Sequence, residues 1–347
     1  MTPRQRARRQ DGRRARHALC WGVAALVACL LGLNALMERW HPDEFDLVYA
    51  RRSEALKQRR HEHPGSPVVL VMGSSRVAMG FAPEWLEEAD GSGQRPLIFN
   101  FSRFGQGPKL HRITMQRLAR DGLLPDAFVL ELIPSHLYKE GDPFIIGSLG
   151  TFDLETAHRY MPLHRLLRYH CERRLELVTR YPQRLLGLRD SPVDGEGHFN
   201  RLGGYADLEE SISAEERRTR MAQTYRYYYK PMTEFRIAPA SDRALRDCLA
   251  FCQSRGIKVV LLLTPEGTTL RSWYAPGADQ MMADYFAALQ RDYQFQLVDG
   301  RNWLADHEFY DDHHMLRGGA ETFTHRLDRE VLANLFGVPD DQRLVNK

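Results

Sequence analysis

A continuous apolar run that ends in small residues constrains the fold more than any other feature of this sequence. The run reads Pro-Val-Val-Leu-Val-Met-Gly-Ser-Ser and occupies residues 67–75. An uninterrupted apolar strand is typical of a parallel sheet that is covered on both faces. Sheets of this kind place their binding and catalytic sites just beyond the carboxyl ends of the strands. The segment therefore predicts a buried parallel strand with a candidate site at its end.

Four further segments share this apolar character, and helical patterns separate the strands. The other predicted strands are Leu97–Phe101, Phe128–Leu132, Val259–Leu263 and Phe295–Val298. The predicted helices are Lys109–Asp121, Ser241–Arg255, Asp279–Asp292 and Gly319–Leu335. Because strands alternate with helices, the sequence predicts a three-layer α/β fold.

The stretch from about residue 141 to residue 239 interrupts this alternation, and we interpret it as an insertion, mainly helical, in the α/β domain. It is rich in arginine, tyrosine and histidine. Its tyrosine cluster comprises Tyr225, Tyr227, Tyr228 and Tyr229. Aromatic faces pack on sugar rings, so the cluster is compatible with a carbohydrate-contacting surface, but an aromatic cluster more often serves ordinary packing.

The N-terminal region has the pattern of a membrane anchor. Ala18–Met37 contains no charged residue and has about the length needed to cross a bilayer. Seven arginines lie in the first 16 residues, and acidic residues follow the apolar segment. The positive-inside rule then predicts a cytoplasmic tail and a periplasmic domain in a bacterium. A cleaved signal peptide is the alternative, but the apolar segment is longer than a usual signal core and no small-x-small cleavage site follows it.

These patterns together predict the domain organisation and exclude one class of partner. We expect a tail at 1–17, a transmembrane helix at 18–37, a partly helical stalk at 38–66 and one domain at 67–338. The formal net charge is +3, but without the arginine-rich tail 41 basic and 44 acidic residues remain. A nearly neutral domain lacks the clustered positive charge of a nucleic-acid binder, so no nucleic-acid partner is expected.

Two short segments carry the candidate catalytic residues. Ser75 stands in Gly-Ser-Ser-Arg directly after the first strand, on a turn that would expose its hydroxyl near backbone N–H groups. Asp311 and His314 form a D-x-x-H pattern just before the last predicted helix. A serine nucleophile needs a base, and a carboxylate beside the imidazole fixes its tautomer and stabilises the imidazolium. One D-x-x-H loop can supply both groups.

Other histidines and acids raise the alternative of a metal site. Asp312 and His313 adjoin the D-x-x-H pattern, and His61 and His63 form an H-x-H pattern upstream. The sequence offers no third ligand at a sensible spacing from these pairs. We therefore interpret Asp312 and His313 as cap or surface residues, and we expect neither a metal nor a cofactor.

Together the two segments resemble the SGNH (GDSL-like) hydrolase superfamily. In that family's pattern the nucleophile is the third residue of a G-D-S-like block after the first strand, which falls on Ser75, with Ser74 in place of aspartate. The C-terminal D-x-x-H block falls on Asp311 and His314, and the glycine that follows the histidine in the family matches Gly319. The resemblance covers roughly residues 67–140 and 241–335, and it implies a flavodoxin-like sheet with a Ser-His-Asp triad.

The resemblance also implies an oxyanion hole, with one departure from the family. The glycine of the second block is best matched by Gly105. The third block should carry an asparagine, but this chain reads Glu-Leu-Ile-Pro-Ser-His at 131–136. The expected oxyanion donors are therefore the backbone N–H groups of Ser75 and Gly105, with a further donor from Ser135.

An N-terminal span and a G-S-S-type block make the chain similar to one branch of this superfamily, namely the D-alanyl-transfer protein of teichoic-acid synthesis and the alginate-type periplasmic O-acetyltransferases. That branch works beside a multi-span membrane-bound O-acyltransferase. The resemblance implies acyl transfer to or from hydroxyls of a cell-envelope polysaccharide or a teichoic-acid-like glycan, without a metal or cofactor. The alternative, favoured by the missing asparagine, is a non-catalytic protein that binds a glycan or a partner in such a system.

Overall fold

A five-stranded parallel sheet forms the centre of the molecule. The computed structural model describes residues 3–40, 46–89, 95–138, 149–169, 171–172 and 199–336. Within these residues the strands are β1 (Val68–Met72), β2 (Leu97–Asn100), β3 (Ala127–Glu131), β4 (Lys258–Leu263) and β5 (Gln296–Asp299). Their order is β2-β1-β3-β4-β5, and every pair is parallel. This is the strand order of flavodoxin-like sheets, and the predicted α/β class is confirmed.

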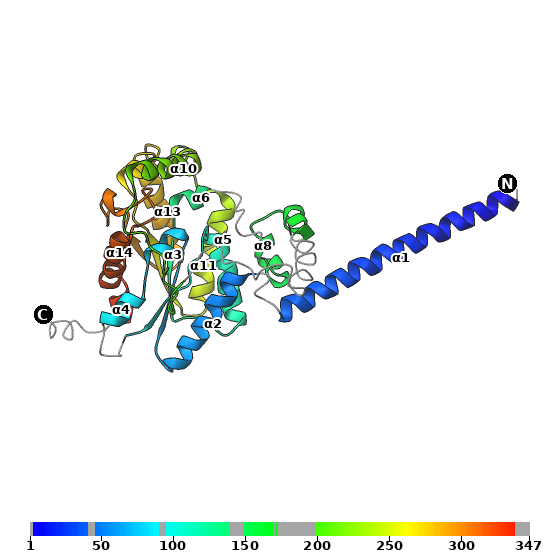
Figure 1. Ribbon diagram of the computed structural model, residues 1–347, viewed down its shortest axis with the longest axis horizontal. Helices are drawn as coiled ribbons and strands as arrows, with labels where there is room; N and C mark the ends of the chain where they lie inside the picture. Colours follow the sequence, from blue (N-terminus) through cyan, green and yellow to red (C-terminus); the bar gives the residue numbers. More distant parts are fainter. Residues whose placement is uncertain are drawn as a thin grey trace.

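Helices cover both faces of the sheet because successive strand residues point to opposite sides. Leu70 and Met72 of β1 belong to one apolar cluster, whereas Val69 and Val71 belong to a second. The first cluster is covered by α2 (Leu47–Glu62), α5 (Pro108–Arg120), α11 (Pro239–Gln253) and α13 (Ala278–Asp292). The second is covered by α3 (Ser75–Gly80), α4 (Glu84–Ala89) and α14 (Arg317–Glu330), as Figure 1 shows. The sheet is therefore buried on both sides, as its continuous apolar strands predict.

The four predicted helices are present with small shifts at their ends. They correspond to α5, α11, α13 and α14, and only the last differs by more than two residues at one end. There, α14 stops at Glu330 and a 3₁₀ turn, η4 (Leu332–Asn334), continues the chain.

The segment predicted as a stalk contains a helix of the folded body. In α2, Leu56 is fully buried in the core, and Arg52 donates to the carbonyl oxygens of Asn100 (2.5 Å) and Gly203 (3.0 Å). The sequence of α2 is polar because arginine side chains, as well as apolar ones, make its contacts with the rest of the domain. Residues 41–45 of the predicted stalk lie outside the described residues.

One long helix lies in the region predicted as an insertion. It is α10 (Ala214–Thr233), which follows the short helices η2 (Thr151–Asp153) and α8 (Leu154–His158). Residues 141–148 and 173–198 of the predicted insertion lie outside the described residues. Further short elements are α6 (Pro134–Tyr138), α12 (Thr268–Arg271), η3 (Asp306–Glu308) and a helical segment at 163–169. The domain boundaries themselves stay a prediction.

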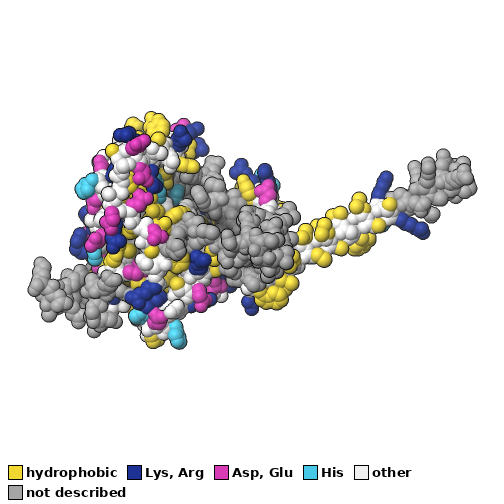
Figure 2. Space-filling view, in the orientation of Figure 1, with side chains coloured by type: hydrophobic (Ala, Val, Ile, Leu, Met, Phe, Trp, Pro, Cys, Tyr) yellow, Lys and Arg dark blue, Asp and Glu magenta, His cyan; other side chains and the backbone are white. Residues whose placement is uncertain are grey.

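The N-terminal helix α1 (Pro3–Trp40) runs away from the body (Figure 1). Figure 2 shows apolar side chains along it, and Leu19, Trp21 and Leu26 are among the exposed ones. In the described part of the chain, no helix combines the length and the apolar character required to cross a membrane. The structure therefore does not support the transmembrane helix predicted at 18–37.

Candidate active site

Ser75 is the first residue of α3, immediately beyond the carboxyl end of β1. The side chain of Ser74 caps this helix by accepting a hydrogen bond from the Arg76 N–H at 3.2 Å. The turn is tightly packed, because a Cβ atom on Gly73 would come within 2.8 Å of the Glu131 side chain. Glycine at 73 thus allows β1 and β3 to approach at the point where Ser75 is presented.

Asp311 and His314 lie on one loop between β5 and α14. The Asp311 carboxylate accepts the backbone N–H of His314 at 2.7 Å, and its other oxygen lies 2.7 Å from His314 Nδ1. The loop turns sharply at Asp312, which has a positive φ of 64°, and the Asp312 carbonyl accepts the Gly267 N–H at 2.8 Å. The carboxylate therefore holds both the backbone and the ring of His314.

The structure brings the three predicted catalytic side chains into one chain of contacts. His314 Nε2 lies 2.7 Å from Ser75 Oγ, although the two residues are 239 positions apart in sequence. Burial favours the neutral form of Asp311, but the neighbouring His313 and His314 outweigh it and hold the pKa of Asp311 well below its usual range. An anionic Asp311 favours a proton on Nδ1 of His314, which leaves Nε2 able to accept the proton of Ser75.

The three predicted oxyanion donors lie in different environments. Gly105 lines the same cavity as Ser75, and its φ of 71° is one that glycine adopts readily. In the described part of the chain, the backbone N–H groups of Ser75 and Gly105 have no hydrogen-bond partner. Ser135 is buried in α6 and is absent from the described residues that line the cavity, whereas its neighbour His136 is one of them. Two backbone donors thus belong to residues that line the cavity, whereas Ser135 is not among its described lining residues.

A cavity of about 740 Å³ opens above Ser75. The helix α10 forms one wall through Arg220, Gln223, Thr224, Tyr227 and Tyr228. The remaining described lining includes Met79, Phe104, Lys109, Tyr205, Tyr310 and His313. The cavity therefore combines aromatic walls with two basic residues and the catalytic groups.

The tyrosine cluster of α10 divides between this cavity and the outer surface. Tyr227 and Tyr228 line the cavity. Tyr225 and Tyr229 instead stack on each other, with ring centroids 4.3 Å apart, and each contacts Trp273 edge-on. Only Tyr227 and Tyr228 are therefore placed to meet a substrate at Ser75, and the carbohydrate contact stays a prediction.

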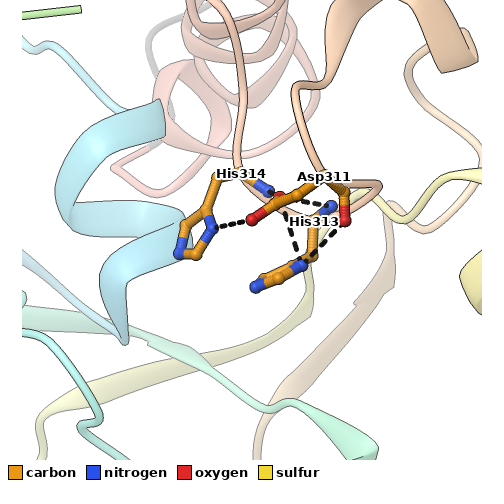
Figure 3. A group of neighbouring side chains, drawn as sticks. All are labelled: Asp311, His313 and His314. Carbon is orange, nitrogen blue, oxygen red and sulfur yellow. Dashed lines mark hydrogen bonds and ion pairs between the residues drawn. The ribbon is translucent and has the colours of Figure 1, made fainter. Parts of the chain in front are cut away.

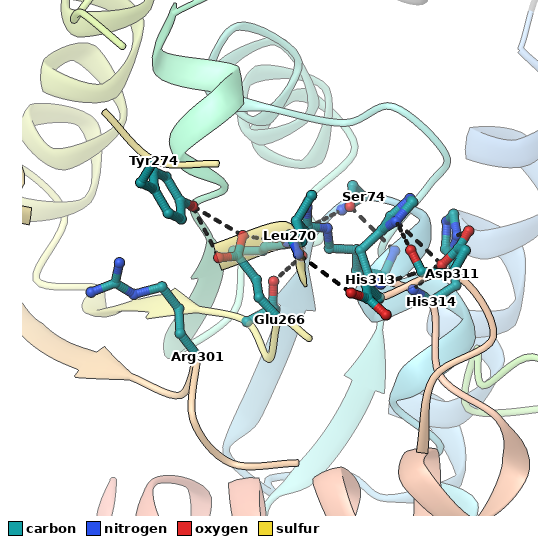
Figure 4. Close-up of polar contacts among 12 residues, drawn as sticks. Ser74, Glu266, Leu270, Tyr274, Arg301, Asp311, His313 and His314 are labelled. Atoms are coloured by element: carbon teal, nitrogen blue, oxygen red, sulfur yellow. Dashed lines mark hydrogen bonds and ion pairs between the residues drawn. The ribbon is translucent and has the colours of Figure 1, made fainter. Parts of the chain in front are cut away.

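Charged side chains are buried next to the turn that carries Ser75, and Figure 4 shows polar contacts of this region with Ser74 and Glu266 labelled. Arg76 pairs with Glu266 at 2.9 Å, and both side chains are 1% exposed. Glu131 accepts hydrogen bonds from the Ser74 N–H and from the Thr264 hydroxyl. Burial raises the pKa of Glu131 above its usual value, although the Arg76 charge and the Ser74 N–H oppose this shift. The nucleophile turn thus rests on acceptors that sequence reasoning had not identified.

Asp311, His313 and His314 also form the metal-capable cluster of the described residues (Figure 3). A zinc ion between a carboxylate and an imidazole needs about 2 Å to each ligand atom. In a tetrahedral zinc site two such ligand atoms lie roughly 3.3 Å apart, and the 2.7 Å contact between Asp311 Oδ2 and His314 Nδ1 is shorter than that spacing. The arrangement therefore fits a hydrogen-bonded pair better than a pair of metal ligands.

Comparison with known proteins does not identify a function for this chain. A family that carries no functional description matches residues 212–336. No curated protein matches the chain. A solved structure from Streptococcus pneumonia, provisionally described as a platelet activating factor, has a TM-score of 0.34 and 14% identity, covering 85% of this chain and 96% of that chain.

Proposed function

We propose that this protein is a serine O-acyltransferase or esterase of the SGNH type that acts on cell-envelope polysaccharide. The observation that carries the proposal is the pair of 2.7 Å contacts linking Ser75 Oγ to His314 Nε2 and His314 Nδ1 to Asp311. These contacts have the order and tautomer that nucleophilic catalysis by serine requires. The cavity above Ser75 is large enough for a sugar ring and an acyl group.

The proposed reaction proceeds in two halves. Ser75 Oγ attacks the acyl carbonyl while His314 Nε2 takes its proton, and the backbone N–H groups of Ser75 and Gly105 donate to the oxyanion. His314 then returns the proton to the leaving alcohol. In the second half a sugar hydroxyl or water gives its proton to His314 and attacks the acyl carbon. The bond between that carbon and Ser75 Oγ then breaks, and His314 returns the proton to Ser75. Throughout, Asp311 stabilises the imidazolium of His314 and keeps it oriented.

The location and partner are separate parts of the proposal. We propose that α1 attaches the protein to the bacterial cytoplasmic membrane, with the domain in the periplasm beside a multi-span membrane-bound O-acyltransferase. The arginine-rich tail and the exposed apolar side chains of α1 support attachment. A tethered domain would meet a membrane source of acyl groups at high effective concentration. Alkaline extraction of isolated membranes tests this part, because an attached protein stays in the pellet and a released one contradicts the proposal.

Covalent labelling of the full-length protein tests the catalytic part. We expect a fluorophosphonate to label the wild type and 4-nitrophenyl acetate to be hydrolysed, with activity falling on the order of 10⁴- to 10⁶-fold in Ser75→Ala and His314→Ala. Ser272→Ala and His307→Ala change exposed residues of the same types and serve as controls. A folded wild type that neither labels nor hydrolyses the ester contradicts catalysis and favours the non-catalytic binding function.

A further inference from the structure

His313 is a buried histidine of the catalytic loop for which the proposed reaction has no role. It is 4% exposed, yet it is one of the residues that line the cavity above Ser75. Its ring packs edge-on against Tyr228 at 4.9 Å and lies 4.0 Å from the ring of His314, measured between centroids. A polar ring in this position must either satisfy its own nitrogens or offer one to a bound molecule.

The contacts of His313 fix which nitrogen carries the proton. Nδ1 lies 3.1 Å from the carbonyl oxygen of Asp311 and 3.2 Å from a carboxylate oxygen of the same residue. Both are acceptors, so Nδ1 must carry a hydrogen. Burial, followed by the charge of His314, lowers the pKa of His313 well below its usual value, which Asp311 only partly opposes. The ring is therefore neutral, and Nε2 carries a lone pair and no hydrogen.

Within the described part of the chain this lone pair has no hydrogen-bond donor. The hydrogen-bond contact of the His313 ring is made by Nδ1. The rings of His313 and His314 lie on the same side of Asp311 (Figure 3). The interplanar angle between them is 42°. When a bound molecule places one hydroxyl at His314 Nε2, the atoms next to that hydroxyl therefore lie close to the ring of His313.

We propose that Nε2 of His313 accepts a hydrogen bond from a second hydroxyl of the acceptor, adjacent to the hydroxyl that is acylated. The preferred acceptor is then a vicinal diol, as found on a sugar ring, and not an isolated alcohol. This inference rests on the proposed acyltransferase function. It makes His313 a specificity-determining residue beside the catalytic pair.

The transfer step is balanced without any further reactant. The first hydroxyl gives its proton to His314 Nε2 as its oxygen forms a bond to the acyl carbon. The bond between that carbon and Ser75 Oγ then breaks, and His314 returns the proton to Ser75. The second hydroxyl keeps its proton throughout and donates it, as a hydrogen bond, to His313. It therefore orients the acceptor and takes no part in bond formation.

Partitioning of the acyl-enzyme tests the inference on the full-length protein. Ser75 is acylated with 4-nitrophenyl acetate in the presence of cis-1,2-cyclohexanediol or cyclohexanol at equal hydroxyl concentration, and the two ester products are quantified. The product ratio does not depend on how fast Ser75 is acylated. We expect the wild type to favour the diol about fivefold, the usual effect of one hydrogen bond.

Two substitutions separate recognition from a purely structural role. The amide N–H of asparagine can replace Nδ1, so His313→Asn keeps the donor to Asp311 and loses the acceptor. The amide oxygen of glutamine can reach the position of Nε2, so His313→Gln keeps the acceptor and loses that donor. We expect the diol preference to disappear in His313→Asn and to persist in His313→Gln.

The outcomes distinguish this inference from the function on which it rests. Three results would overturn the role of His313 and leave the esterase intact, provided that fluorophosphonate still labels Ser75. They are a wild type without diol preference, a preference that survives in His313→Asn, and a preference that is lost in His313→Gln. A folded wild type in which Ser75 is never labelled would instead overturn the proposed function, and the inference with it.

Discussion

Two buried arginines of this protein are bonded in opposite ways. Arg117 of α5 donates to Asp46 at 2.6 Å and to Asp153 at 2.5–3.2 Å, so that its guanidinium joins two carboxylates. Arg76 of α3 pairs with Glu266 alone at 2.9 Å, and its Nε and Nη2 have no partner among the described residues. Each guanidinium nitrogen of Arg117 thus has a hydrogen-bond acceptor, whereas two of those of Arg76 have none among the described residues.

The difference corresponds to position in the fold. Arg117 connects α5 with the residue that caps α2 and with η2, on the face of the sheet away from the catalytic loop. Arg76 follows the nucleophile directly, and its guanidinium lies 5.5 Å from the ring of Tyr228 in the cavity wall. We infer that the α5 region mainly determines stability and that the edge bearing Arg76 mainly determines activity. The predictions below test this division.

The largest expected effect is on activity alone. Asp311→Asn keeps an acceptor for the backbone N–H of His314 but removes the charge that fixes its tautomer. We expect kcat/KM for 4-nitrophenyl acetate to fall about 10⁴-fold, with the urea midpoint nearly unchanged. A variant that loses stability and keeps its activity would contradict the division.

Next in size is an effect on stability alone. Arg117→Met leaves Asp46 and Asp153 buried without their shared cation, which should lower the free energy of unfolding by about 3–5 kcal/mol. Activity per folded molecule should not change. Arg120→Met on the same helix is the matched control, because the Arg120 and Asp121 side chains are 48% and 27% exposed and loss of their pair should cost less than about 1 kcal/mol. Equal losses in the two variants would show that burial of the Arg117 group has no special effect.

A pH-dependent effect of intermediate size is expected from the same helix. Burial lowers the pKa of His111 to about 3, and its Nε2 has no partner among the described residues. The unfolded chain therefore binds a proton below about pH 6.5 that the folded chain binds only near pH 3, so stability falls as the pH drops through this window. Between pH 7 and pH 5 the loss from His111 should be about 2 kcal/mol.

His111→Leu measures this contribution by urea unfolding at the two pH values. In this variant the difference in the free energy of unfolding between pH 7 and pH 5 should be smaller by about 2 kcal/mol. It should not vanish, because the pKa of buried His313 is also lowered. An unchanged difference between pH 7 and pH 5 would show that His111 does not titrate as its burial implies.

The smallest expected effect concerns Arg76. Arg76→Lys keeps a positive charge for Glu266 and removes the planar group that faces Tyr228. We expect kcat to fall about tenfold with little change in KM, because the variant disturbs the nucleophile turn and not the outer cavity. A change in KM alone would instead place Arg76 in substrate binding.

The sequence predicts the sheet well because buried parallel strands are uninterrupted apolar runs, as in β1 and β4. It predicts Ser75, Asp311 and His314 because each lies in a short local pattern at a strand or helix end. It cannot show that His136, and not Ser135, faces the cavity, since one residue turns a helix by about 100°. It singles out the tyrosine cluster but cannot place Tyr227 and Tyr228 beside Ser75, because that contact joins segments far apart in the sequence.

The 239-residue separation between Ser75 and His314 has a consequence for biosynthesis. Translation proceeds from the N-terminus, so a nascent chain can form β1 and present its serine long before the loop that holds its base has been made. A chain ended after β5 has every described strand of the sheet but neither Asp311 nor His314. Under the proposed function, chains truncated before this loop lack the base for Ser75, so we expect reactivity only when nearly the whole polypeptide has been made.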